Sequence, residues 1–378
     1  DKYRLENIIN LCKTNMGKRK FRQILLNPKC NVKELNESYD LIKHIYSKKY
    51  VNSWEKELMN IRDIERLKRK SILNKITPYD FYTLYENLQQ IKKIINVLIK
   101  DKKLSKELNA EKNKINCNKL IDFLEKYFII KECKQINTTY FDKNIQQNDF
   151  KNFIKRGNYD EYDNCLRKKS DYRCGLNEIV KYLSQKSIEY DSKVKSPQTY
   201  IKIHTTSTQG ISLLITKKRS TILKKAVQKM KEHGDSIRIE FYSVYDNETK
   251  EIELDTNIDV MNHISKNMMI TSTKINNIIF QISKVEEEFT IILQNVYQKI
   301  QKEFNLMEDM FYELNEFVME IDVLYSKVKM IDVFHLSCPV IKEKDVSYVN
   351  IKKLRHLIIE SMNNDELYVS NDIKINNS

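Results

Sequence analysis

A long segment without glycine or proline, between Gly234 and Pro339, constrains the fold of this chain more than any other feature. Within it, apolar residues recur three and four positions apart from Ile275 to Leu324. This spacing keeps one face of an α-helix apolar, as in a packed helical seam. The sequence therefore predicts one helix from about residue 271 to 328. A helix of that length needs a partner helix to cover its apolar face.

The hydrophobic period changes in the region before this segment. β-branched and aromatic residues there partly alternate with polar ones, which is typical of strands; they are Tyr200, Ile201, Ile203, Ile211, Leu213, Ile215, Ile237, Ile239, Phe241, Ile252 and Leu254. Upstream, the run from Leu176 to Leu183 returns to helical spacing. We therefore expect two antiparallel helices with a small β-rich domain inserted at their end.

The composition favours a mainly α-helical protein. Only 5 glycines and 4 prolines occur in 378 residues, and 31% of residues are charged against 41% hydrophobic, a balance typical of amphipathic helices. The first hundred residues keep a helical period, and Thr77-Pro78 places a capping hydroxyl before a proline suited to the first turn. These residues predict a multi-helix core ahead of the long helices.

An excess of basic residues points to a polyanionic partner. The formal net charge is +14, which favours nucleic acid or anionic lipid, although the coding bias of an AT-rich genome also produces lysine-rich chains. Seven cations and no anion lie between residues 217 and 231, directly after a predicted strand. Such a cluster neutralises phosphates without reading base sequence; the alternative is an ordinary solvated helix face.

Signatures of metal binding and of membrane insertion are missing from the sequence. The seven cysteines include no Cys-x-x-Cys pair, and the histidines lie at no ligand spacing, so we predict no metal site and no catalytic residue. No run of about 18 apolar residues exists to cross a bilayer. Scattered cysteines favour a reducing intracellular compartment, such as the nucleus, the cytoplasm or a DNA-containing organelle. Because no initiator Met or signal peptide precedes residue 1, we expect the chain to begin inside a larger protein.

Several motifs, in the same order, resemble the MutS family of DNA mismatch-repair ATPases. The N-terminal Thr14-Asn15-Met16-Gly17-Lys18-Arg19, followed by Asn27-Pro28, is similar to the start of the family's core. Ile61-Arg62-Asp63-Ile64-Glu65-Arg66-Leu67 resembles a second core element, with Arg62 where proline is usual. The resemblance continues at Arg156 to Asp163, at Gln209 to Lys217 and, most specifically, at Glu320-Ile321-Asp322-Val323-Leu324-Tyr325-Ser326.

The resemblance implies a domain organisation for the chain. It suggests a helical core and ascending lever helix over residues 1–187, an inserted clamp domain over 188–268 and a returning lever helix over 269–339. Residues 340–378 resemble the beginning of the ATPase domain through Lys353 to His356 and Leu367 to Asp372. No Gly-x-x-x-x-Gly-Lys-(Ser/Thr) phosphate loop occurs, so we expect ATP hydrolysis, with ATP and Mg²⁺, in the parent protein and not in this chain.

The resemblance also assigns candidate functional residues and partners. It implies phosphate contacts to duplex DNA, and we place them at Lys217, Lys218, Arg219, Lys224 and Lys225. In the parent, it implies that Tyr368 stacks on adenine with Asn371 nearby, and that two subunits form a homodimer or heterodimer around the duplex. No cofactor is expected in this chain. Asp322 and Ser326, four residues apart on one helix face, are expected to make structural hydrogen bonds.

Three alternatives remain open from the sequence. One is a structural coiled-coil protein of the hinge type, against which the multi-helix start of the chain argues. A second is a MutS homologue that acts in recombination instead of mismatch repair. The third is a protein that binds a membrane surface, which is disfavoured because residues 217–231 lack large aromatic anchors.

Overall fold

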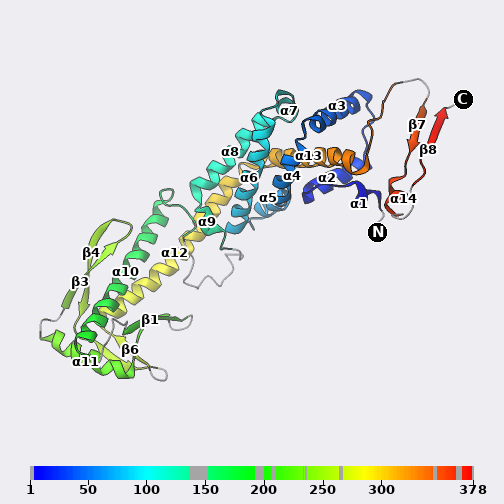
Figure 1. The fold of residues 1–378 in the computed structure, drawn as a ribbon. Helices are drawn as coiled ribbons and strands as arrows, with labels where there is room; N and C mark the ends of the chain where they lie inside the picture. Colours follow the sequence, from blue (N-terminus) through cyan, green and yellow to red (C-terminus); the bar gives the residue numbers. More distant parts are fainter. Residues whose placement is uncertain are drawn as a thin grey trace. The chain divides into compact units, whose positions relative to one another are not determined.

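The computed structural model describes residues 4–136, 152–191, 200–206, 210–232, 234, 236–263, 267–343, 347–362 and 368–376. Most of the polar stretch 135–148, and also Gln209 and Leu367, lie outside these residues. The described part is mostly helical with small antiparallel sheets, which confirms the predicted mainly α class (Figure 1). Contacts divide the chain into two compact units: unit 1 holds residues 1–139, 152–154 and 301–378, and unit 2 holds 140–151 and 155–300.

Unit 1 is built from helices around α13. Its helices are α1 (Leu5–Ile9), α2 (Asn15–Leu26), α3 (Val32–Lys48), α4 (Val51–Asn60), α5 (Ile64–Ile72), α6 (Pro78–Leu98), α7 (Lys102–Glu107), α8 (Ala110–Tyr127), α9 (Ile130–Cys133), α13 (Glu308–Phe334) and α14 (Leu357–Met362). Helix α6 begins at the predicted place: Thr77 and Asp80 form a capping box, with Pro78 in the first turn. Strands β7 (Tyr348–Leu354) and β8 (Asn371–Asn376) form an antiparallel pair.

The segment before α2 is held in place by a buried carboxylate on α13. Asp322 accepts hydrogen bonds from the backbone N–H of Lys13 (2.9 Å) and of Thr14 (2.7 Å) and from the Thr14 hydroxyl (2.6 Å). One turn later, Ser326 accepts from the Leu11 N–H at 2.9 Å. Burial raises the pKa of Asp322 and, together with Asp322 itself, raises that of the Cys12 thiol to about 12. The predicted structural role of Asp322 and Ser326 is confirmed.

The prediction of one continuous helix from 271 to 328 is wrong. Helix α12 (Thr273–Asn305) ends two residues before α13, which begins at Glu308. The two residues between them make hydrogen bonds to the carbonyl three positions earlier, as in a turn: Leu306 N–H donates to Glu303 O, and Met307 N–H donates to Phe304 O. The apolar period continues across this break, so no local signal marks it. At the break, Asn305 accepts a hydrogen bond from Ser71 at 2.5 Å, and Leu306 is 87% exposed.

Unit 2 pairs two helices in antiparallel fashion around a β-rich domain. Helix α10 (Asp160–Glu189) lies beside α12, and the Tyr162 and Phe289 rings are 5.5 Å apart (Figure 1). Further along, Arg173 on α10 pairs with Glu286 on α12. Most of α12 therefore belongs to unit 2, and the predicted boundaries at 187 and 268 fall inside this unit. The domain division that they draw stays a prediction.

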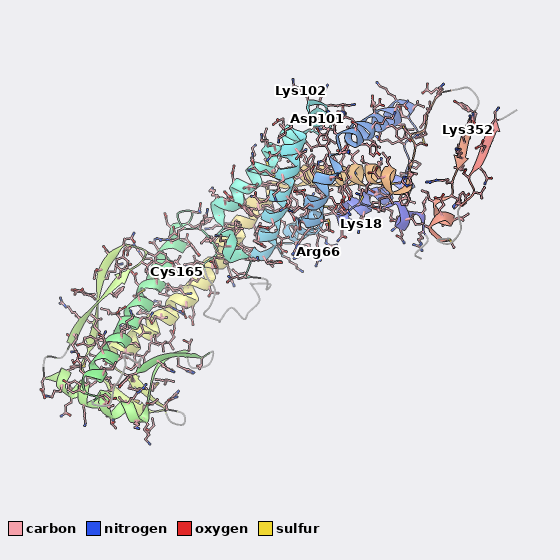
Figure 2. All side chains as sticks on the ribbon, viewed as in Figure 1. Lys18, Arg66, Asp101, Lys102, Cys165 and Lys352 are labelled. Carbon is pink, nitrogen blue, oxygen red and sulfur yellow. The ribbon has the colours of Figure 1, made fainter. Side chains whose placement is uncertain are left out.

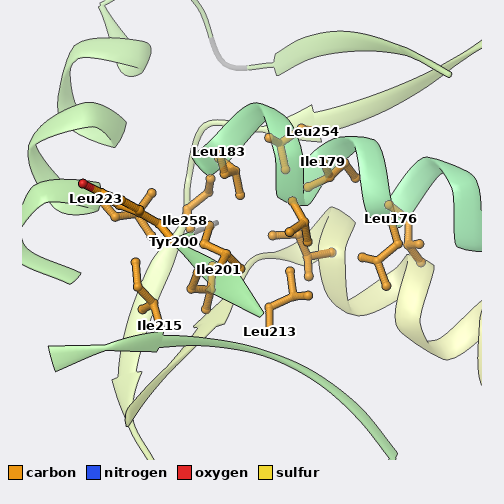
Figure 3. Packing of buried hydrophobic residues seen from close by; sticks show 14 of the residues in the cluster. Leu176, Ile179, Leu183, Tyr200, Ile201, Leu213, Ile215, Leu223, Leu254 and Ile258 are labelled. Carbon is orange, nitrogen blue, oxygen red and sulfur yellow. The ribbon is translucent and has the colours of Figure 1, made fainter. Parts of the chain in front are cut away.

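Two antiparallel sheets make up the β-rich part of unit 2. The strands are β1 (Ile201–Thr206), β2 (Gly210–Thr216), β3 (Ser236–Ser243), β4 (Glu248–Asp255), β5 (Asp259–Asn262) and β6 (Asn267–Thr271). They form one sheet in the order β1-β2-β6-β5 and a separate β3–β4 hairpin. The first four strands were predicted from the sequence, whereas β5 and β6 were not. One apolar core joins both sheets to α10, α11 (Lys217–Lys231) and α12, and Leu183, Leu213, Leu223 and Leu254 meet in it (Figure 3).

Candidate nucleic-acid interface

The basic run predicted to contact DNA forms the amphipathic helix α11. One face is buried in the core of unit 2 and consists of Ser220, Leu223, Ala226, Val227 and Met230. Because a helix advances about 100° per residue, the lysines of the run fall on the opposite arc. That face is exposed at Lys217, Lys218, Lys224, Lys225, Lys229 and Lys231. The structure thus brings the predicted lysines together on one solvent-facing surface, which we call the α11 cationic face.

Four of these lysines have no anionic partner in the described part of the chain. Among the residues that the structure describes, Lys217, Lys218, Lys224 and Lys225 form no ion pair. They follow β2 directly, and β2 is anchored by its register with β1 and β6 on either side. Four exposed ammonium groups are therefore held on a rigid element, where they can meet an external anion.

Arg219 differs from its neighbours and was predicted to act with them. Its guanidinium lies over the Tyr200 ring, 4.4 Å from the centroid, and the residue is only half exposed. Stacking of this kind fixes the guanidinium and buries part of its stem. Arg219 therefore helps to fasten α11 to the residue that directly precedes β1, and its substitution would change packing as well as charge. No local pattern in the sequence indicates this contact with Tyr200.

The first turn of α11 is unfavourable for helix stability. It contains Lys217, Lys218 and Arg219 and no acidic residue, and the Thr216 side chain makes no capping hydrogen bond. Cations at a helix N-terminus oppose the helix dipole and cost about 0.3–1 kcal/mol each at exposed positions. Free backbone N–H groups and ammonium groups together are the partners that a phosphate oxygen takes. The arrangement therefore suits anion binding better than it suits the helix alone.

The two residues predicted to contact adenine lie at the β7–β8 pair in unit 1. Tyr368 is half buried just before β8, and Asn371 is exposed at the first position of β8 opposite Leu354. Tyr368 offers a ring for a base. However, the sequence contains no phosphate loop, and no cluster of metal-binding side chains occurs among the described residues. The described residues around Tyr368 and Asn371 therefore do not form a complete Mg²⁺–ATP site, and their contact with adenine stays a prediction.

Comparison with known proteins identifies the family. The family model of MutS domain III matches residues 1–327. The chain belongs to the MutS family. A protein of Acanthamoeba polyphaga mimivirus, described as a DNA mismatch repair protein mutS homologue, is 26% identical over 98% of this chain and 32% of its own length. MutS of Petrotoga mobilis is 23% identical over 97% of the chain, and MutS of Caldanaerobacter subterraneus is 23% identical over 98%.

This MutS-family chain corresponds to only part of those relatives. It spans 32% of the mimivirus protein, 39% of the Petrotoga protein and 36% of the Caldanaerobacter protein.

Along the described residues, no helix combines the length and the apolar character needed to cross a membrane. The structure brings together two of the motifs that resemble the family. Thr14, in the first motif, donates a hydrogen bond to Asp322, in the motif from Glu320 to Ser326, and Gly17 lies close to the same carboxylate.

Proposed function

We propose that this chain is a DNA-binding part of a MutS-family mismatch-repair ATPase and holds duplex DNA through the α11 cationic face. The observation that carries the proposal is the set of four exposed lysines without ion pairs, among the described residues, on a helix whose other face is fixed in the core. Lysines of this kind neutralise backbone phosphates and release counterions, which gives affinity for any duplex sequence.

The coupling of DNA binding to ATP is part of the same proposal. Helix α12 continues the core of unit 2 and is followed by α13, which carries Asp322 and Ser326. In the intact protein, nucleotide binding shifts these helices between two discrete arrangements, and this shift changes how the DNA-binding surface holds the duplex. ATP, Mg²⁺ and a second MutS-family subunit belong to that protein, with Tyr368 stacking on the adenine. A role in recombination would use the same DNA-binding surface.

The salt dependence of duplex binding tests the proposal. Replacement of Lys217, Lys218, Lys224 and Lys225 by alanine should weaken binding to all duplex sequences alike. The slope of log K against log salt concentration should become shallower by about 0.9 for each phosphate that a lysine no longer neutralises, up to about 3.6 for all four. Fluorescence anisotropy with two unrelated duplexes at several salt concentrations measures both effects.

A matched variant controls for net charge. Four exposed lysines in unit 1 also lack ion pairs among the described residues; Lys100 lies just before α7, and Lys102, Lys103 and Lys106 lie on it. Their replacement by alanine changes the net charge by the same four units, and Figure 2 marks Lys102 among them. The control variant should keep the wild-type slope. Equal loss of affinity in both variants would refute a localised DNA-binding face.

A further inference from the structure

An open hollow in unit 1 gathers lysines that the proposed DNA interface does not use. It has a volume of about 460 Å³ and lies between the segment before α2, the end of α4 and the second half of α13. Lys13, Lys18 and Lys329 line it together with Tyr325, Met59 and Val333. This volume falls within the range of about 300–1,000 Å³ that small-ligand pockets span.

The cations of this hollow outnumber the carboxylates that pair with them. The Glu55 carboxylate forms ion pairs with the ammonium groups of Lys13, at 2.8 Å, and of Lys329, at 3.8 Å. One carboxylate is therefore shared by two lysines. Lys18, which Figure 2 labels, is exposed and makes no ion pair within 4 Å among the described residues, although the buried Asp322 carboxylate attracts it over a longer distance. Ammonium groups brought together with too few carboxylates create a local positive potential, which an anion relieves.

A buried tyrosine hydroxyl lies at the same place. The Tyr325 side chain is fully buried, and its hydroxyl interacts with the side chains of Lys13 and Glu55. Burial raises the pKa of this phenol to about 12, so it stays a neutral donor at physiological pH. Lys13, Glu55 and Tyr325 therefore form one polar cluster at the edge of the hollow.

Two exposed apolar side chains also line the hollow. Met59 is 66% exposed and Val333 is 49% exposed, although both are large hydrophobic side chains. A site that combines a few convergent polar groups with exposed apolar ones is typical of ligand binding. The two kinds of group suit a molecule with an anionic end and a less polar body.

We propose that this hollow binds a small phosphorylated ligand. Lys18 and Lys329 hold its phosphate oxygens by charge-assisted hydrogen bonds, and Lys13 joins them from its pair with Glu55. Tyr325 helps to position Lys13 and Glu55 beside the phosphate, and the organic part of the ligand packs on Met59 and Val333. Backbone phosphates of DNA share this chemistry, and the experiment separates the two sources.

Isothermal titration calorimetry with inorganic pyrophosphate at low ionic strength tests this site. The wild-type chain should bind one pyrophosphate. The double variant Lys18→Ala with Lys329→Ala should bind it about tenfold more weakly or not at all, because two of three ammonium partners are removed. The variant Glu55→Gln should bind it more tightly, because Lys13 and Lys329 lose the carboxylate that competes with the ligand.

Controls distinguish this site from general charge effects and from DNA binding. Replacement of Lys102 and Lys103 by alanine removes two exposed charges elsewhere in unit 1 and should leave pyrophosphate binding unchanged. Absence of pyrophosphate binding by the wild-type chain would overturn the proposal, as would equal binding by the double variant. Loss of duplex affinity in the double variant, without pyrophosphate binding by the wild type, would assign the lysines to DNA instead. The proposed function at α11 does not depend on any of these results.

Discussion

Replacing Gly17 by alanine tests the junction between the N-terminal segment and α13. A Cβ atom built on Gly17 would lie 2.1 Å from the Asp322 Oδ2 atom and 2.7 Å from its Cγ atom, which is closer than real Cβ contacts. The Asp322 side chain cannot stay where it is beside an alanine. Since Oδ2 accepts from the N–H and the hydroxyl of Thr14, its displacement breaks both hydrogen bonds.

The expected cost follows from these two hydrogen bonds. Hydrogen bonds to a charged acceptor contribute about 1.5–3 kcal/mol each, so breaking two costs about 3–6 kcal/mol. Alanine is favoured over glycine within a helix by about 1 kcal/mol, which offsets part of this cost. We therefore expect Gly17→Ala to lower the free energy of unfolding of unit 1 by about 2–5 kcal/mol.

The single tryptophan provides the assay. Trp54 is fully buried on α4 in unit 1, so its fluorescence during urea denaturation reports the unfolding of this unit. Gly175→Ala is the matched control, because its Cβ atom meets only the flexible Cδ1 end of Ile252, in unit 2. In an Asp322→Ala background, Gly17→Ala should cost much less, since the clashing carboxylate is gone. A Gly17→Ala chain as stable as the wild type would refute this account of the junction.

Two further predictions concern local stability. Thr77→Ala removes the capping box of α6 and should lower the free energy of unfolding by about 1–2 kcal/mol, measured by the same Trp54 transition; an unchanged midpoint would contradict the capping role. Lys250 forms ion pairs with Asp171 and Asp246, and it lowers the pKa of Asp246 below its ordinary 3.8. The stability that this ion pair gives to the folded hairpin is therefore complete above pH 3.8 and is lost as the pH falls through the lowered pKa. The protection factors of the β3–β4 hairpin amides, which compare the exchange rate with the intrinsic rate at the same pH, should therefore fall in acid for the wild type, whereas Lys250→Met should show low protection throughout; identical pH profiles of protection would exclude this contribution.

Local signals in the sequence predicted most of the secondary structure. Thr77-Pro78 marked the start of α6, and alternation around Ile239 and Leu254 marked β3 and β4, because caps and periodicity act over a few residues. The structural role of Asp322 was predicted, but its partner Thr14 lies 308 residues away and no local pattern names it. Contacts of this range depend on the tertiary fold.

The candidate sites were less accessible to sequence reasoning than the fold. The run at α11 was visible as charge, yet the packing of Arg219 on Tyr200 required coordinates. The break before α13 was missed because Phe304 and Phe311 keep the helical spacing across it, and both remain buried. The hollow beside Tyr325 combines residues from distant segments, so no motif could indicate it.

Chemical footprinting of lysines is the most direct test of the central claim, that the α11 cationic face holds duplex DNA. Acetylation of the chain with and without duplex, followed by mass spectrometry, compares the reactivity of individual lysines. Bound DNA should protect Lys217, Lys218, Lys224 and Lys225 for any duplex sequence, while Lys102 and Lys103 on α7 stay reactive. Saturating duplex that leaves the four α11 lysines as reactive as in the free chain would contradict the account.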